Sequence, residues 1–532
     1  MGLHATEIVL LAVYLVVTFG LAIYAGRRTD DANSLNGYFL AGRSLPWYLI
    51  GLSFYASNMS GASFVGLIGA GYAHGLAVFH YEWTAALVLA VFALAIAPVF
   101  LRARLFTVTE YLEHRFDRRT RLAYALFTLV TLLFIDMAGA LYAGAVVLVT
   151  GLPFLDLWTA CLLISALTGL YTVLGGLRTV VITDALQAAV LIAGALAVAI
   201  YGLVAVGGWH ALITRLDERY LTLFHGPADA FMPWPGILGV TILGFYYWSF
   251  NQYFVQRALA ARSIDHARWG GLFGGLLKLP NLLLMIVPGL IAAVLFPGLA
   301  SPDLAFPKLT FELLPAGLRG IVLAAMLAAI MSSLDSALNA AASIVTMDVT
   351  RTLRPGWDDR RLFLTGRIAT VVLVVAAALY APLIGSFGSL FAYFQSTLAY
   401  LVPPFVAIYL GGLFWPRLGR GAAYWTLVIV EPVALSLYFA IEMTGAWTNL
   451  GLGRPHFTYV ALALLLATFT VMAAANRDQH AIPADRALSA SWRDLSANGL
   501  TSRSWLVDPR VLAALLLLTT AALLAALAAI AS

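Results

Sequence analysis

Charged side chains are scarce in this chain of 532 residues. Asp, Glu, Lys and Arg make up 11% of the sequence, whereas hydrophobic residues make up 62%. Soluble domains carry about 25% charged residues, so this composition excludes one large soluble enzyme. The apolar residues gather in blocks of about 20, the length that a helix needs to cross a hydrocarbon core of about 30 Å. The sequence therefore predicts an all-α protein that crosses the membrane many times.

Cysteine and the common catalytic motifs are also nearly absent. The single cysteine, Cys161, excludes an internal disulfide framework and a multi-cysteine metal site. The chain lacks a phosphate loop ending in Gly-Lys-Ser/Thr, an HExxH metal motif and a GxSxG nucleophile elbow. The net charge of +5 indicates basic loops and not a nucleic-acid partner. We therefore expect no enzyme, no nucleic-acid binding and no particular protein partner.

About fourteen membrane spans fit the apolar blocks. They lie near residues 8–25, 47–72, 81–101, 122–150, 155–174, 179–205, 234–256, 270–296, 319–350, 362–385, 388–412, 421–441, 456–475 and 511–530. With an external N-terminus, most arginines, Arg257 among them, fall in cytoplasmic loops, as the positive-inside rule requires. Both termini are then external, and residues 476–510 form a cytoplasmic loop. We expect a multi-pass protein of the plasma or inner membrane.

Two spans carry small and polar residues at their centres. Residues 51–66 read Gly-Leu-Ser-Phe-Tyr-Ala-Ser-Asn-Met-Ser-Gly-Ala-Ser-Phe-Val-Gly, and residues 244–253 read Gly-Phe-Tyr-Tyr-Trp-Ser-Phe-Asn-Gln-Tyr. They are the second and seventh spans and cross the membrane in opposite senses. Interrupted helices at matching places in two inverted halves indicate the binding site of a transporter. The alternative is a Gly/Ser-rich face that packs helices together.

Charges at membrane depth need a partner or water, which makes them candidates for function. Glu82 lies between Tyr81 and Trp83 at the outer start of the third span, and Lys278 lies within the eighth. A carboxylate and an ammonium group flanked by aromatic rings suit a polyol, because each can bond several hydroxyls while a ring stacks on the apolar face of a sugar. The alternative is a purely structural ion pair between Glu82 and Lys278.

Several oxygen-bearing side chains fall on the ninth span. Ser332 and Ser336 are four residues apart and share a helix face, while Ser333 points toward a neighbour and Asp335 adds negative charge. Hard cations prefer oxygen ligands, so this helix is a candidate for a sodium site. The alternative is that these serines bond back to their own helix. Asp184, near the cytoplasmic end of the sixth span, could guard an ion exit or pair with Arg178.

Five stretches combine into a pattern that is specific as a set. They are residues 56–66, 81–83, 175–187, 246–257 with Lys278, and 332–339 with 346–348. On these residues, and over about residues 5–475, the chain resembles the sodium/solute symporter family, in particular its sodium/galactose and sodium/glucose branch. The resemblance implies an inverted five-plus-five helix repeat of the leucine-transporter type.

The resemblance also implies a division of the chain into an extra helix, two repeats and further helices. The parts are residues 1–46 with an extra N-terminal transmembrane helix and loop, 47–205 as inverted repeat one, 206–233 as an external loop, 234–412 as inverted repeat two, and 413–532 with the C-terminal helices.

The resemblance further implies the functional residues. A sodium site would use the backbone carbonyls of Ala56, Met59 and Ala329 with the hydroxyls of Ser332 and Ser333. A possible second cation site, found in some relatives, would use Asp184, Ser332, Asp335 and Ser336. The substrate-binding set would be Glu82, Lys278, Gln395, Ser63 and Asn58, with Tyr247 as an inner gate and Phe391 and Leu67 as an outer lid.

Three positions depart from the galactose carrier of that branch: Ser63 replaces glutamine, Gly244 replaces asparagine and Ala85 replaces serine. These losses remove hydroxyl partners, so galactose itself does not follow. We predict a sodium-coupled symporter that imports a neutral, hexose-like sugar by alternating access. The alternative solutes are myo-inositol, a monocarboxylate, sialic acid or an amino acid.

Overall fold

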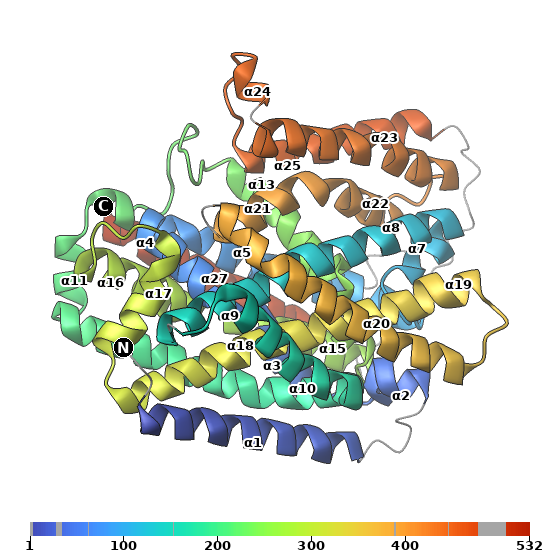
Figure 1. Cartoon of the computed structure of the whole chain (residues 1–532). Coiled ribbons are helices and arrows are strands. Elements are labelled where there is room, and N and C mark those ends of the chain that lie inside the picture. The colour runs from blue at the N-terminus through green and yellow to red at the C-terminus, as the bar shows by residue number, and fades with distance from the viewer. Residues whose placement is uncertain are drawn as a thin grey trace.

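The computed structural model describes residues 4–27, 34–61, 63–152, 154–387, 390–444, 446–476 and 507–531, which form a helical bundle (Figure 1). Within these ranges, strand-like pairing is limited to two isolated bridges, Leu45 with Ala261 and His225 with Pro233. The predicted all-α class is therefore confirmed. Most of the expected cytoplasmic loop 476–510 lies outside the described residues.

The bundle is built from long helices joined by short helical turns. The main helices are α1 (Ala5–Arg27), α3 (Trp47–Asn58), α4 (Ile68–His74), α5 (His80–Val91), α6 (Ala97–Arg102), α8 (Arg118–Thr131), α9 (Ala138–Gly151), α10 (Leu157–Val206), α13 (Gly236–Phe245), α14 (Gln252–Leu259), α15 (Ile264–Lys278), α16 (Val287–Leu295), α18 (Ala316–Ser343), α20 (Asp359–Tyr380), α21 (Leu390–Leu401), α22 (Pro403–Phe414), α23 (Arg420–Tyr438), α25 (Phe457–Ala475) and α27 (Pro509–Ala531).

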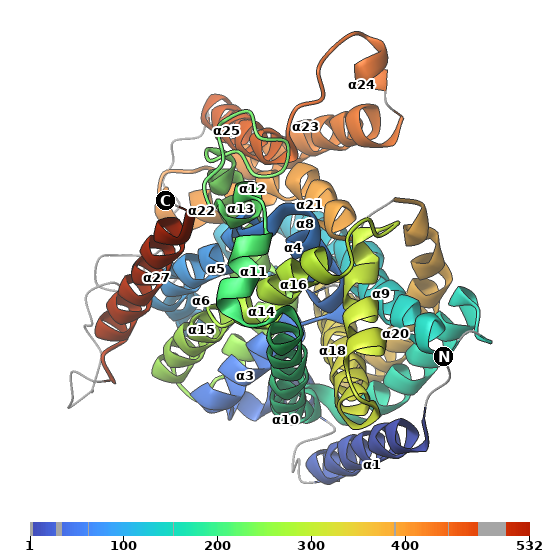
Figure 2. The ribbon, with the colours of Figure 1, turned by 90° about the vertical axis from the view of Figure 1, so that its left-hand side faces the viewer.

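Shorter helices complete the structure. They are α2 (Leu35–Leu40), α7 (Glu110–Arg115), α11 (Trp209–Arg215), α12 (Glu218–Leu221), α17 (Ala305–Lys308), α19 (Arg351–Leu353) and α24 (Ala446–Asn449). Helix α1 lies along one edge of the bundle and α27 along another flank (Figure 2). Helices α3, α10 and α18 pack against one another, and α15 packs against α3.

Ten helices in the described part of the chain are long and apolar enough to cross a membrane, or up to 11 if each bent helix pair counts as one span. The expected number of fourteen is not confirmed by this measure. Breaks and bends explain the difference, because they leave pieces such as Leu157–Leu170 and Gly236–Phe250 that are shorter than a full crossing. One such bend, of 50°, separates α21 from α22.

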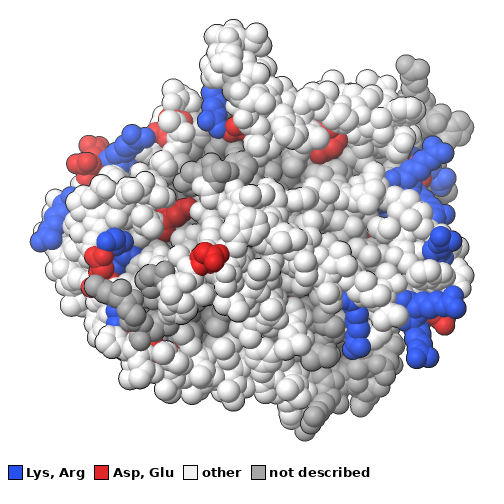
Figure 3. Space-filling model, in the orientation of Figure 1, with Lys and Arg blue, Asp and Glu red and all other residues white. Residues whose placement is uncertain are grey.

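Charge is distributed as a membrane protein requires. On the face shown in Figure 3, Lys and Arg gather at the right-hand end, acidic and basic residues mix at the left-hand end, and the surface between them is mostly uncharged. The marked N and C ends both lie on the left in Figure 1, so the two termini share one side. That this side is external stays a prediction.

Both predicted helix interruptions are present. Helix α3 ends at Asn58, Met59 is non-helical with φ −76° and ψ 64°, and a π-helical turn (η2, Ser63–Leu67) leads into α4. The second interruption is at Asn251, whose backbone is extended between η6 (Tyr246–Phe250) and α14. Backbone groups freed in this way at membrane depth must find partners inside the protein.

A glycine bends the longest helix. Within α10, Gly176 has φ 62° and ψ −174°, a conformation open essentially to glycine alone. A Cβ atom at Gly176 would lie 2.7 Å from the backbone oxygen of Tyr38 in α2. Gly176 therefore lets one continuous helical stretch form two of the predicted spans. The bend between them lies against the short helix α2.

We expect Gly176→Ala to destabilise the protein by about 1–3 kcal/mol, because the backbone conformation is strained for any residue with a Cβ and the new methyl group meets Tyr38. The thermal unfolding midpoint in detergent should fall by several degrees. Gly317→Ala is the matched control, since a Cβ atom there meets nothing within 4 Å. Equal midpoints for the two variants would contradict this account of the bend.

Candidate functional site

A cavity whose wall contains both polar and apolar side chains lies between the two interrupted helices. It is bordered by α3 and η2, by α5, by α13 and η6, by α15 and by α21. All seven residues of the expected substrate-binding set line it: Asn58, Ser63, Glu82, Tyr247, Lys278, Phe391 and Gln395. These residues come from five separate helical segments, so the fold brings together positions that are distant in the sequence.

An ion pair dominates the chemistry of the cavity. Lys278 and Glu82 are in direct salt-bridge contact, although only 1% and 4% of their surfaces are exposed. The ammonium group of Lys278 also donates to the Asn58 side chain and lies 5.7 Å from the centre of the Trp248 ring. Two buried charges of this kind are stable only as a hydrogen-bonded pair. The pair presents both donors and acceptors to the cavity.

The sequence alone did not reveal the residue that fixes Glu82. The side-chain amide of Asn281 donates to Glu82, while its oxygen accepts from the hydroxyl of Tyr55 at 3.2 Å. Asn281 follows Lys278 by three residues, the spacing that places two side chains on one helix face. That spacing was the signal that could have identified Asn281 as a partner of the ion pair.

Aromatic and apolar side chains also line the cavity. Leu67, Tyr81 and Phe391 are among them, with the rings of Tyr81 and Phe391 in edge-to-face contact at 4.9 Å. The Tyr247 ring also lines the cavity and packs on Phe254 at 4.5 Å. Tyr81 is an addition to the expected lid, and the roles of lid and inner gate stay predictions.

The expected sodium ligands meet where α3 ends against α18. The hydroxyl of Ser332 donates to the carbonyls of Ala56 at 3.0 Å and Ala329 at 3.1 Å. The hydroxyl of Ser333 donates to the Ala329 carbonyl at 2.9 Å and to the Ser57 carbonyl at 3.0 Å. Each hydroxyl thus bonds back to its own helix, as the alternative interpretation expected, and also reaches the broken helix; the sodium site stays a prediction.

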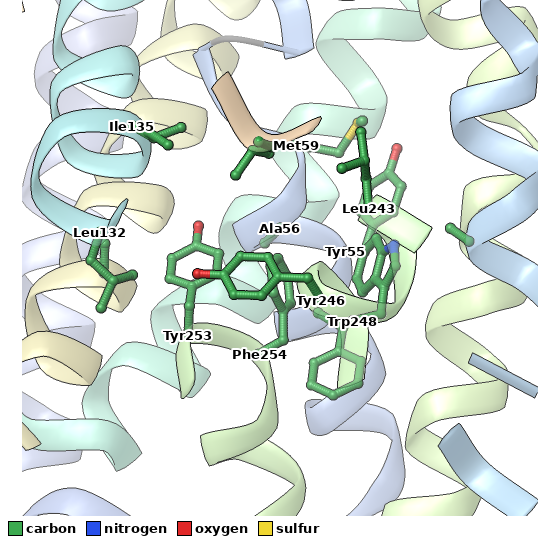
Figure 4. Close-up of a cluster of buried hydrophobic side chains, with 14 of the residues drawn as sticks. Tyr55, Ala56, Met59, Leu132, Ile135, Leu243, Tyr246, Trp248, Tyr253 and Phe254 are labelled. Atoms are coloured by element: carbon green, nitrogen blue, oxygen red, sulfur yellow. The ribbon is translucent and has the colours of Figure 1, made fainter. Parts of the chain in front are cut away.

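The surroundings of this oxygen cluster are aromatic. Figure 4 shows Ala56 and Met59 among the rings of Tyr55, Tyr246, Trp248 and Tyr253. Met59 is fully buried at the end of α3, and the Tyr253 hydroxyl donates to the carbonyl of Ser57 at 2.6 Å. A cation placed here would be held by backbone and hydroxyl oxygens, since no group of three His, Cys, Asp or Glu among the described residues could hold a metal ion.

The possible second cation site already contains a positive charge. The guanidinium of Arg257 is fully buried, donates to the hydroxyls of Ser53, Ser57 and Ser336, and lies 3.4 Å from the carboxylate of Asp184. Asp335 is adjacent and accepts from Ser336 at 3.1 Å.

The placement of Arg257 in a cytoplasmic loop was therefore wrong. A buried Asp184 needs a counter-ion, and Arg257 supplies it from the last turn of α14, the short helix after the second break.

Comparisons with known proteins agree with this geometry. The model of the sodium:solute symporter family matches residues 38–429. Sodium/glucose cotransporter 4 of Danio rerio is 31% identical over 92% of this chain and 81% of its own length. Sodium/myo-inositol cotransporter 2 of Oryctolagus cuniculus is 35% identical over 80% of this chain and 69% of its own length.

Two solved structures share the fold. A Na+-coupled sialic acid symporter in a substrate-bound outward-open state has a TM-score of 0.76, with 20% identity over 89% of this chain and 98% of that chain. A nucleobase-cation-symport-1 family transporter has a TM-score of 0.57, with 15% identity over 84% of this chain and 97% of that chain. The fold is thus the leucine-transporter type, and the chain belongs to the sodium:solute symporter family.

Proposed function

We propose that this sodium-coupled symporter imports a neutral polyol, most specifically a hexose, through the cavity that contains Glu82 and Lys278. The main observation behind this proposal is that the buried Glu82 carboxylate and Lys278 ammonium group line the same cavity as the ring of Trp248. Charged groups form the strongest hydrogen bonds to hydroxyls, and an aromatic ring packs on the apolar face of a sugar. The glucose and myo-inositol cotransporters among the relatives support the same class of solute.

The charge balance of the cavity argues against an anionic solute. Among the described residues that line it, Lys278 alone carries a positive charge, and Glu82 already neutralises that charge. A monocarboxylate or a sialic acid would bring a second negative charge to a buried site without a free cation, which costs several kcal/mol. A neutral solute adds hydroxyls and no charge, so both members of the ion pair keep a partner.

Sodium would act by joining the two helices that carry the pocket. Binding at the carbonyls of Ala56, Met59 and Ala329 requires the hydroxyls of Ser332 and Ser333 to turn their lone pairs toward the ion. The ion then replaces the hydrogen bonds that now connect the end of α3 to α18. Because Asn58 follows Ala56 by two residues and contacts Lys278, fixing this end of α3 also fixes the pocket.

The membrane potential supplies the energy for uptake. Each sodium ion that crosses the full membrane gains about 2.3 kcal/mol per 100 mV, in addition to its concentration gradient. We infer that one sodium ion moves per solute. The second set of oxygens, around Asp184 and Ser336, already holds the guanidinium of Arg257, and a further cation there would meet a like charge.

The first prediction concerns the solute. Protein in liposomes with an inward sodium gradient should accumulate a labelled hexose or inositol and should not accumulate monocarboxylates, sialic acid or amino acids. Combined Lys278→Met and Glu82→Gln substitutions should lower uptake about 100-fold or more, because they remove the charged hydrogen bonds without leaving one charge unpaired. Uptake from a panel of solutes measures both effects.

Lys308→Met is the matched control for that experiment, since Lys308 is exposed and pairs with Glu312 away from the cavity. Sodium-dependent thermal stabilisation should survive in the double variant, because its ligands lie elsewhere. Normal hexose uptake by the double variant would show that the solute binds at another place.

The second prediction concerns the sodium ligands. Ser333→Ala should raise the sodium concentration for half-maximal uptake about tenfold, because one oxygen ligand is lost, an effect of about 1.4 kcal/mol. Ser343→Ala is the control: this serine is buried on the same helix and bonds the Ala340 carbonyl at 2.7 Å. An unchanged sodium dependence in Ser333→Ala would remove its hydroxyl from the ligand set.

The third prediction concerns stoichiometry. Initial fluxes of radioactive sodium and of labelled solute, measured in the same vesicles, should have a ratio near one. This follows from the position of Arg257, which neutralises Asp184 and occupies the neighbouring hydroxyls. A ratio near two would mean that the guanidinium leaves these oxygens or shares them with an ion during the cycle.

A further inference from the structure

A segment of the external stretch 206–233 packs over the lid of the cavity. The Phe231 ring lies 6.1 Å from Phe391 and 6.4 Å from Tyr81, the two aromatic residues of the lid. On its other side Phe231 stacks on His74 at 3.8 Å with the rings nearly parallel. Phe231 is therefore an aromatic layer outside the lid, supplied by a part of the chain that does not line the cavity itself.

We propose that Phe231 is a further gating residue: it holds the outer lid closed over the solute, and neutral histidines position it. The proposal rests on the proposed function of the cavity as the solute site. It makes the loop of residues 222–233, here called the outer cap, part of the transport machinery and not a simple connection between helices. Three sets of contacts fix the outer cap, and they are made by His456, His80 and Asp229.

His456 binds the backbone of Phe231. Its Nε2 lies 2.8 Å from the carbonyl oxygen of Phe231, which can only accept, so this nitrogen carries the proton. Its Nδ1 lies 2.6 Å from the hydroxyl of Thr458 and 3.4 Å from the backbone N–H of Thr458, at the start of α25. Both nitrogens are thus used in the neutral form of the ring, in which Nδ1 accepts. A second proton on Nδ1 would oppose the Thr458 N–H and force the Thr458 hydroxyl to change from donor to acceptor.

His80 fixes the other end of the outer cap in the same manner. Its Nε2 donates to the carbonyl of Leu223 at 2.8 Å, and its Nδ1 accepts from the indole N–H of Trp83 at 2.9 Å. These two bonds require the neutral form of the His80 ring, because a second proton on Nδ1 would point at the indole N–H of Trp83. Trp83 neighbours Glu82, so the anchor of the outer cap is one residue away from the ion pair.

Asp229 shapes the turn that presents Phe231. Its carboxylate accepts from the backbone N–H groups of Phe231 at 2.9 Å and Met232 at 2.8 Å. Although burial acts in the opposite direction, these bonds lower the pKa of Asp229. Asp229 also lies 3.4 Å from Arg219 and 3.7 Å from His225. The Asp229 carboxylate is therefore ionised at neutral pH, and the positive charge of Arg219 lies beside it.

Burial and the charges that face the histidines together set the direction of the pH effect. His456 faces the carboxylates of Asp229 and Glu442, and Glu442 pairs with Arg454. His74 faces Arg219, Asp229 and His225, and His80 faces His225. Burial outweighs the carboxylates and lowers the pKa of His456 below its ordinary value of 6.5.

A histidine with a lowered pKa in the capped state binds fewer protons there than in the open state. The outer cap is therefore most stable above pH 6.5 and is weakened as the external pH falls below that value.

The accessibility of the cavity from outside tests the proposal. The chain has one cysteine, Cys161, so a Cys161→Ser background accepts a reporter cysteine at Ala85, which lines the cavity. A membrane-impermeant methanethiosulfonate reagent is added outside vesicles that contain the full chain and sodium. Phe231→Ala should raise the labelling rate about fivefold, and Phe231→Leu should raise it less. This readout needs no transported solute, so it stands even if the solute is not a sugar.

The pH arm separates positioning from simple packing. As the external pH falls from about 7.5 to about 5.5, the labelling rate of the Phe231 protein should approach that of Phe231→Ala. The rate for the Phe231 protein is divided by the rate for Phe231→Ala at each pH, which removes the effect of pH on the ionisation of the reporter thiol. His456→Gln keeps a donor for the Phe231 carbonyl but cannot titrate, so this pH effect should shrink; His210→Gln, an exposed histidine on α11, should keep it. Equal labelling of Phe231 and both of its variants at every pH would overturn the proposal.

Discussion

The hydrogen bonds between two serines of α18 and the open end of α3 are the contacts on which the rest of this structure depends. A helix that stops at Asn58 in the middle of a membrane protein leaves carbonyl groups without partners, and each would cost several kcal/mol in a hydrocarbon environment. Ser332 and Ser333 satisfy the carbonyls of Ala56 and Ser57 from a helix of the other half of the chain. The same break turns Asn58 toward Lys278. One local constraint thus creates the cation ligands and shapes the solute cavity.

The sequence predicted this centre well because the signals there are chemical and local. Small and polar residues inside an apolar span identified both breaks, and Glu82, Lys278, Ser332 and Ser333 stood out as polar groups at membrane depth. The seven expected cavity residues came together mainly through the family resemblance, since residues as far apart as Ser63 and Gln395 share no local pattern. The sequence did not predict the buried position of Arg257, because a lone arginine between apolar blocks is typical of a loop. Only the fold shows that Asp184 lies beside it.

Several buried charges in this protein form ion pairs that join separate parts of the bundle, and three of these pairs differ in their position. Glu82 with Lys278 connects α5 to α15, Asp184 with Arg257 connects α10 to α14, and Glu7 with Arg319 connects α1 to α18. Breaking any one of them would leave an uncompensated charge, which is strongly destabilising. The three pairs differ in their access to the cavity. Only the first lines it within the described residues, and that difference separates a pair that can exchange partners with a solute from pairs that hold helices together.

The 50° bend between α21 and α22 makes their junction a pivot in the wall of the pocket. Both helices pack against α25 and α23, and α21 carries Phe391 and Gln395 to the cavity. Phe391 lies eleven residues before the bend at Val402, a lever of about 16 Å at 1.5 Å per residue. A tilt of about 10° around this pivot displaces the ring by about 3 Å, and Gln395, seven residues from the pivot, moves by about 2 Å. A small rotation therefore shifts the mouth of the cavity further than it shifts the polar wall.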